Sequence, residues 1–224
     1  MKLIIGNKNY SSWSLRPWIA MKALGIAFEE IVIPFGSPLG NPDFKARIAS
    51  YTPAGKLPAL VDGDTRVWET LAILEYLAEK FPAHGLWPCE PQVRAEARAL
   101  ASEMHAGFSA LRSECPMNIR RPIKSRLLSA AAQADVARIE TMWQSARARS
   151  GGPFLFGQFS AVDAMYAPVA SRLDTYGIEV SRDTRDYIDA VMALPAFAEW
   201  RAAAIAETWI VPEDEVDWPT VLTA

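Results

Sequence analysis

The sequence predicts an α/β domain followed by an all-helical domain, with a short linker between them. Strand, helix and strand patterns follow one another within residues 3–33, which is typical of an α/β fold. A stretch rich in Pro and Gly occupies residues 82–91, and apolar residues recur at helical spacing beyond it. The 224 residues are enough for two domains of modest size.

The first elements predict a βαβ unit. Residues 3–6 are a short apolar run, typical of a buried strand. Residues 15–24 carry apolar side chains at helical spacing, and Gly25 stops that helix. Residues 28–33 form the second strand. Because so few residues connect the two strands through a helix, we expect them to be parallel.

The remainder of the first domain, predicted at residues 1–81, completes the order βαβ-α-ββα. A loop with three Pro and two Gly occupies residues 34–42. Asp62-Gly63 is a hairpin signal, so the strands on either side of it should be antiparallel. The elements expected in this part are a short helix at 44–49, strands at 57–61 and 65–68, and a helix at 70–80.

The second domain, predicted at residues 92–224 after the linker at 82–91, should contain helices alone. One of these helices opens with the sequence FSAVD at residues 159–163, which is a capping box behind an apolar residue. The helices expected here span 92–111, 123–149, 160–176, 182–192 and 195–208.

Charge and composition exclude several classes of protein. With 23 basic and 26 acidic residues, the net charge of −3 favours neither nucleic acid nor a membrane surface as a partner. Cys89 and Cys115 form no CxxC pair, so we expect two reduced thiols. With only His84 and His105 besides, no metal site is predicted. The short apolar N-terminus and the absence of a run of about 20 apolar residues predict a cytoplasmic protein.

Three short motifs fall at turns of the first domain. Residues 10–16, at the turn into the first helix, read YSSWSLR. Residues 55–60, which enter the third strand, read GKLPAL, and residues 68–73, which enter the next helix, read WETLAI. Hydroxyls at a helix start cap the helix or donate to an anion there, and the residues alone leave both roles open.

Taken with the order of elements, these motifs resemble the cytosolic glutathione transferases over essentially the whole chain. The first is similar to the SSCS-x-R element of the zeta class, with Trp13 in place of the cysteine. The third is similar to the family's ES-x-AI element, with Thr70 in place of the serine. The resemblance implies a thioredoxin-like domain that binds glutathione, a helical domain that forms the wall for an electrophilic substrate, and a homodimer of the bacterial serine type.

The resemblance assigns the catalytic hydroxyl to Ser11, with Ser12 as the close alternative. In the family this hydroxyl donates a hydrogen bond to the glutathione sulfur. A hydrogen bond to the charged form, beside the positive end of a helix dipole, favours the reactive thiolate.

The other two motifs are implied to hold the remainder of glutathione. Pro58 matches a proline that is cis in the family, and the backbone of Leu57 would pair with the cysteinyl unit in a strand-like way. Lys56 would lie near the glycyl carboxylate. Glu69 would bind the γ-glutamyl ammonium, and Thr70 the neighbouring carboxylate at a helix N-terminus.

The electrophile pocket is expected where the helical domain faces the Ser11 turn, and its cations would attract an acidic or electrophilic substrate. The residues predicted to line it are Trp13, Met104, Phe108, Arg112, Met117, Asn118 and Arg120. The arginine with which the zeta class binds a substrate carboxylate aligns near Thr175, with Arg172 one turn earlier. Maleylacetoacetate isomerisation is therefore not predicted. Trp209 and the acidic residues 213–215 either cover the site or leave it open.

The predicted function is that of a glutathione transferase that conjugates or isomerises a small electrophile. The alternative is a non-catalytic glutathione-binding or interaction module with the same fold. A module has no need of Lys56, Glu69 and Thr70 together, which favours the enzyme. A thiol oxidoreductase is disfavoured, because the turn at residues 10–16 carries hydroxyls and no cysteine.

Overall fold

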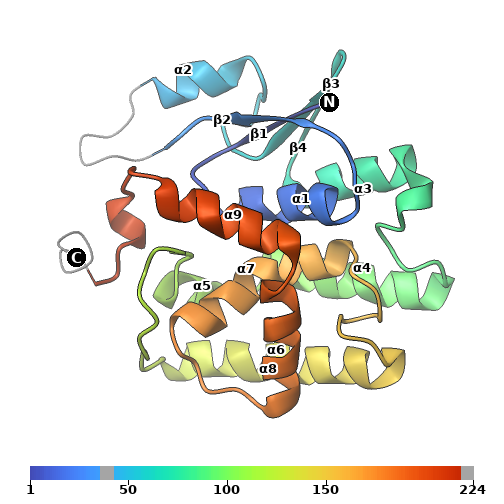
Figure 1. Ribbon diagram of the computed structural model, residues 1–224, viewed down its shortest axis with the longest axis vertical. Coiled ribbons are helices and arrows are strands. Elements are labelled where there is room, and N and C mark those ends of the chain that lie inside the picture. Colours follow the sequence, from blue (N-terminus) through green and yellow to red (C-terminus); the bar gives the residue numbers. More distant parts are fainter. Residues whose placement is uncertain (36–42, 218–224) are drawn as a thin grey trace.

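A computed structural model describes residues 1–35 and 43–217 of the protein. A four-stranded sheet lies at one end, with the helical part beneath it (Figure 1). The strand order is β2-β1-β3-β4; β1 and β2 are parallel, and the other neighbours are antiparallel. The strands are β1 Lys2–Ile5, β2 Glu29–Val32, β3 Ala59–Asp62 and β4 Thr65–Trp68. The predicted order βαβ-α-ββα is confirmed, although most of the predicted loop at 34–42 lies outside the described residues.

Helices cover both faces of this sheet. The short helix α2 (Phe44–Ala49) packs on the outer face, where Ile48 joins a small core with Ile4, Ile33 and Ala59. Helices α1 (Ser12–Ala23) and α3 (Thr70–Lys80) lie between the sheet and the helical part (Figure 1). Helix α1 begins three residues earlier than predicted, so Ser11 is its N-cap and Ser12 its first residue.

The second half of the described chain is helical, as predicted. The elements are 3₁₀ turns at Pro82–His84 and Pro212–Asp214 and helices α4 Pro91–Ala106, α5 Ser109–Glu114, α6 Ala130–Ser150, α7 Ala161–Thr175, α8 Arg182–Met192 and α9 Pro195–Ala206. Within residues 1–35 and 43–217, no helix is both long and apolar enough to cross a membrane.

Two helices predicted in the second domain differ from the observed ones by more than two residues. The helix expected at 92–111 is two helices, because Phe108 adopts a left-handed backbone with φ of 58° between α4 and α5. The helix expected at 123–149 begins only at Ala130, where the Ser129 hydroxyl caps it by accepting from the Ala132 N–H at 3.2 Å. The chain before it instead hydrogen-bonds to the end of α7 through backbone N–H groups at 124 and 126.

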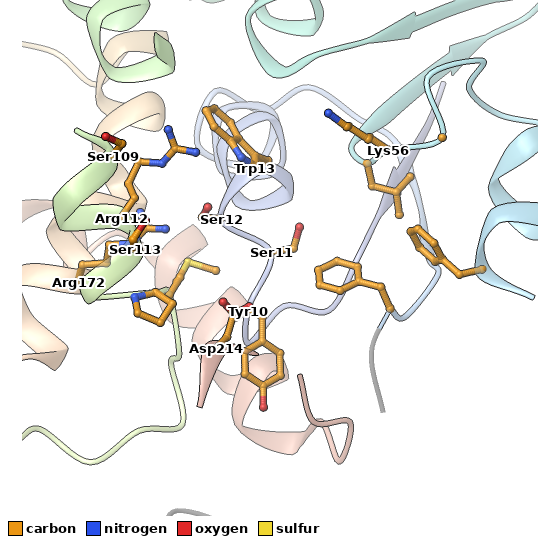
Figure 2. A pocket seen from close by; sticks show the side chains of 16 residues that line it. Tyr10, Ser11, Ser12, Trp13, Lys56, Ser109, Arg112, Ser113, Arg172 and Asp214 are labelled. Carbon is orange, nitrogen blue, oxygen red and sulfur yellow. The ribbon is translucent and has the colours of Figure 1, made fainter. Parts of the chain in front are cut away.

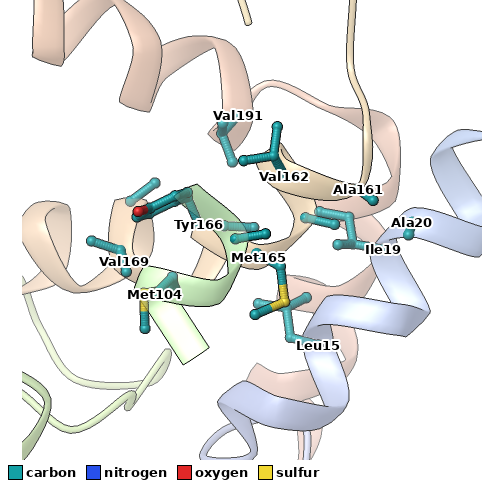
Figure 3. Packing of buried hydrophobic residues seen from close by; sticks show 14 of the residues in the cluster. Leu15, Ile19, Ala20, Met104, Ala161, Val162, Met165, Tyr166, Val169 and Val191 are labelled. Carbon is teal, nitrogen blue, oxygen red and sulfur yellow. The ribbon is translucent and has the colours of Figure 1, made fainter. Parts of the chain in front are cut away.

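Helix α7 is the centre of the core and joins the two halves. Leu15 and Ile19 of α1 point toward Met165 of α7, in a cluster that also takes in α4 and α8 (Figure 3). The predicted capping box is present: the buried Asp163 carboxylate accepts from the Ser160 backbone N–H at 2.9 Å. Because α1 packs directly on α7, the turn that begins α1 faces the helical half.

Candidate active site

Two adjacent cavities open between the sheet-bearing half and the helical half. The first has a volume of about 540 Å³ and the second about 340 Å³. The residues common to both are Trp13, Lys56, Leu57 and Arg112. The first holds Ser11 and Ser12 at its centre, with Lys56 on one side and Arg112 and Arg172 on the other (Figure 2).

The Ser11 hydroxyl faces the first cavity and is not used as a helix cap. It donates instead to the Ser14 hydroxyl oxygen at 2.7 Å, and Ser14 in turn accepts from the Gly6 N–H at 3.1 Å. Of the two roles open to these hydroxyls, capping is therefore not the one Ser11 performs. Ser11 and Ser12 both line the cavity and are 7% and 8% exposed.

The second predicted motif lies along both cavities. Lys56 and Leu57 line each of them, and Pro58 lines the second. The Leu57–Pro58 peptide bond is cis, as the resemblance implied. The chain thus presents the backbone of Leu57 beside a lysine ammonium at the cavity wall.

The third motif lines the second cavity. Glu69 precedes α3 with φ of 68° and ψ of 130°, a conformation that few residues other than glycine adopt and that costs on the order of 1–3 kcal/mol. The buried Thr70 hydroxyl donates to the Trp13 carbonyl at 3.1 Å. That bond fixes the first and third motifs relative to each other.

The expected electrophile pocket is only partly formed by the predicted residues. Trp13, Arg112 and Met117 line the first cavity. Met104 and Phe108 lie elsewhere, buried in the apolar core. Met104 is on the face of α4 that packs on α7, and Phe108 is in the bend between α4 and α5.

Asn118 and Arg120 also lie elsewhere, in contact with the C-terminal part of the chain. The Asn118 amide donates to Glu215 at 2.9 Å. The Arg120 guanidinium donates to the Glu207 carbonyl at 2.5 Å and to the Tyr10 hydroxyl at 2.7 Å. Their polar groups are therefore used to join segments of the protein.

Arg172 is a site residue that the predicted set omitted. It is 4% exposed, its Nε donates to the Cys115 carbonyl at 2.8 Å, and its Nη1 has no partner among the described residues. Burial, together with the nearby charge of Arg112, lowers its pKa to about 10. The sequence signal was an arginine in the mostly apolar helix at 160–176, one turn before the position to which the zeta-class arginine aligns.

Trp13 lies between two guanidinium groups. Its ring centroid is 4.1 Å from Cζ of the buried Arg16 and 4.9 Å from Cζ of Arg112. Burial lowers the pKa of Arg16 well below its usual range, and the charges of Arg172 and Arg112 lower it further. These three arginines lie close enough to affect one another's charge, so the wall formed by α1, α5 and α7 is strongly cationic.

The C-terminal segment 207–217 holds the turn that leads to Ser11. The Glu207 carboxylate accepts from the backbone N–H groups of Lys8 and Asn9 at 2.6 and 3.0 Å. The Glu215 carboxylate accepts from the Tyr10 hydroxyl at 2.5 Å. Neither feature is visible in the sequence, because about 200 residues separate the partners.

Replacing Glu207 with Ala is expected to lower the free energy of unfolding by about 2–3 kcal/mol, because two backbone donors lose a charged acceptor. Urea denaturation measures the change. The matched control is Glu199→Ala on α9, the helix before Glu207; it removes an exposed ion pair with Lys22 of α1 (2.7 Å) and should cost under about 1 kcal/mol. Equal losses for the two variants would contradict the role given to Glu207.

Comparison with known proteins agrees with this geometry. The glutathione S-transferase N-terminal domain family matches residues 10–80, and the C-terminal domain family matches residues 91–203. The maleylacetoacetate isomerase of Rattus norvegicus is 28% identical, over 83% of this chain and 85% of that protein. The dichloromethane dehalogenase of Methylophilus leisingeri is 38% identical, but the match covers 28% of this chain and only 22% of that protein.

Solved structures share the fold. A glutathione transferase homolog from Burkholderia with bound glutathione has a TM-score of 0.69 at 21% identity, covering 91% of this chain and 97% of that one. A maleyl pyruvate isomerase, described as a bacterial zeta-class glutathione S-transferase, has a TM-score of 0.68 at 21% identity, covering 94% and 100%. The predicted fold and the predicted class of enzyme are confirmed. The chain belongs to the glutathione S-transferase family.

Proposed function

We propose that this chain binds glutathione as a thiolate and joins it to, or uses it to isomerise, a small electrophile that carries a carboxylate. The observation that supports this best is the position of Arg112 and Arg172, which line the same cavity as Ser11. A buried guanidinium with a free N–H is costly unless an anion meets it. A carboxylate on the substrate would satisfy it.

The residues of the second and third motifs suit glutathione. Glu69 would bind the ammonium, the start of α3 at Thr70 would bind the adjacent carboxylate, and Lys56 would bind the glycyl carboxylate. The backbone of Leu57, before the cis Pro58, would pair with the central amide. Glutathione supplies the nucleophilic sulfur.

Ser11 is the proposed catalytic hydroxyl, with Ser12 as the alternative. The Ser11 proton now shared with Ser14 is free to turn toward an anion in the cavity. A donor at that place, beside the N-terminus of α1, stabilises thiolate over thiol. This proposal makes the protein a serine-type transferase.

The acceptor side of the cavity, which Arg112 and Arg172 line, favours an enzyme over a non-catalytic module. An interaction surface would present its cations to solvent, whereas Arg172 is buried at the wall of a cavity. The names of two relatives, maleylacetoacetate isomerase and maleyl pyruvate isomerase, refer to carboxylates with a carbon–carbon double bond. An unsaturated keto acid is the acceptor class we propose.

We also propose a cytoplasmic homodimer, with residues 1–81 as the glutathione-binding domain and 92–224 as the acceptor domain. The two family matches, which end at 80 and resume at 91, support this division. Neither nucleic acid nor a membrane is a proposed partner. Light scattering that detects only monomers would refute the dimer.

The test combines binding with turnover. We expect calorimetry to detect glutathione binding, and we expect 4-oxopent-2-enoate to react with a kcat/KM about 10–100 times that of its methyl ester, because the ester lacks the charge that Arg172 would meet. Absence of glutathione binding would refute the proposed function. Equal rates for acid and ester would refute the carboxylate preference alone.

A further inference from the structure

Three consecutive carboxyl groups near the C-terminus occupy three different environments. Glu213 is exposed, and Glu215 is 5% exposed and hydrogen-bonded to Tyr10 and Asn118. Asp214, between them, is half-buried and lines the first cavity together with Ser11 and Arg172. Figure 2 shows Asp214 beside Tyr10, below the side chains of Arg172 and Ser11.

The position of Asp214 is fixed from both sides. Its backbone N–H donates to the Val211 carbonyl at 3.0 Å, and the next N–H, that of Glu215, donates to Pro212 at 3.2 Å. The Glu215 side chain then ties this turn to Tyr10, the residue before Ser11. A carboxyl group is therefore held at the cavity by the same contacts that hold the Ser11 turn.

The surroundings of Asp214 keep its carboxyl group near the point of titration at neutral pH. Burial raises its pKa to about 6, with Arg172 of α7 acting in the opposite direction and Glu213 and Glu215 adding to the rise. The charged and titratable groups around it are these three, with Arg112 of α5, Lys56 and Tyr10 at the same cavity. Acid–base catalysts work best when their pKa lies close to the working pH.

We propose that Asp214 is the acid–base residue of the reaction: its carboxylate takes up the proton that the thiol loses, and the resulting acid gives that proton to the acceptor. This inference rests on the proposed function. It assigns a reacting residue to the acceptor side of the site. Ser11, on the thiol side, supplies only a hydrogen bond to the sulfur. Two of the three acidic residues of the tail thereby acquire separate roles, with Glu215 as the anchor and Asp214 as the reacting group.

The proton balance closes without another reactant. As thiolate forms, the S–H bond breaks and an O–H bond forms on Asp214. The sulfur then bonds to the β-carbon of an unsaturated keto acid, and the π electron pair moves to the α-carbon. The Asp214 O–H bond breaks as a C–H bond forms there, which restores the carboxylate.

Electrostatics keep the proton on Asp214 between these steps. The thiolate and the substrate carboxylate each place a negative charge near Asp214, and like charges favour its neutral form. The pair of groups, sulfur and Asp214, therefore carries one shared proton near neutral pH. Without the aspartate, no carboxylate remains at this place to accept the proton from the thiol.

Proton counting tests this without turnover. Calorimetric titration with glutathione at pH 7, in HEPES and in Tris, yields the number of protons released on binding. We expect wild type to release few, and Asp214→Asn to release up to about one more, because thiolate then forms with no acceptor beside it. The matched control is Glu213→Gln, which loses the neighbouring exposed carboxyl and should behave as wild type.

Kinetics with 4-oxopent-2-enoate provide the second measurement. Asp214→Asn should lower kcat by about 10²–10⁴-fold, the usual contribution of a general acid. In wild type the rate should fall as pH rises and Asp214 loses its proton, and the variant should lack that fall. Glu213→Gln should keep the rate within about twofold of wild type and move the profile only slightly to lower pH, because the charge of Glu213 adds to the rise in the pKa of Asp214.

Several outcomes would overturn the inference. Equal proton release from wild type and Asp214→Asn, with ultraviolet absorbance showing equal thiolate in the two complexes, would show that Asp214 does not receive the proton. A kcat for that variant within about twofold of wild type would show that the acceptor needs no acid. If wild type binds no glutathione, the proposed function fails and the inference with it, which the same titration distinguishes from the first case.

Discussion

Replacing Ser11 with Ala is expected to lower kcat for glutathione conjugation by about 10²–10³-fold, the usual cost of removing one donor to a developing or stored negative charge. The hydroxyl lies at the start of α1 and lines the cavity. Among the described residues, its side chain hydrogen-bonds to Ser14 alone. Glutathione affinity should change little, because Lys56, Leu57, Glu69 and Thr70 would remain.

The reason for the loss is a change in the thiol rather than in binding. Without the hydroxyl, the pKa of the bound thiol rises and the fraction of thiolate at pH 7 falls. Ultraviolet absorbance of the thiolate, followed against pH in the binary complex, measures this directly. The expected result is a thiol pKa in Ser11→Ala above that in wild type.

Ser12→Ala is the matched control, since Ser12 lines the same cavity and is equally buried. If Ser12→Ala loses activity and Ser11→Ala does not, the catalytic hydroxyl belongs to Ser12. If neither variant changes the rate or the thiol pKa, the serine-type mechanism is wrong.

The second large effect is expected at Arg172. Arg172→Met should lower kcat/KM for 4-oxopent-2-enoate by roughly 10–100-fold, equivalent to about 1.4–2.8 kcal/mol, because one partner of a buried charge pair is lost. The preference for the acid over its methyl ester should disappear. Rates for both acceptors, measured with the same preparation, provide the result.

The ester serves as the internal control for folding. Arg172 also donates to the Cys115 carbonyl at 2.8 Å, so the variant loses a structural hydrogen bond. Loss of folded protein would lower both rates together, whereas loss of the anion contact lowers only the rate with the acid. An unchanged ratio of the two rates would contradict the proposed carboxylate site.

Local signals predicted the elements of the chain well. The hairpin signal Asp62-Gly63 falls where β3 ends and the turn to β4 begins, and the helix expected at 70–80 has those bounds. Signals that depend on non-local contacts predicted less well. Nothing near residue 123 in the sequence shows that the chain there bonds to the end of α7, so the start of α6 was misplaced by seven residues.

The same division runs through the candidate site. The fold and the three turns proposed to hold glutathione could be predicted from the sequence, because each turn is a short motif whose residues are neighbours in the chain. On the acceptor wall the sequence predicted Arg112 of α5, whereas the tertiary structure was needed to add Arg172 of α7 and Asp214 of the C-terminal segment. An arginine in a helical pattern looks the same in sequence whether it meets solvent, as most do, or a cavity. Packing of α1 against α7 and the hydrogen bonds of Glu207 and Glu215 place these charges beside Ser11.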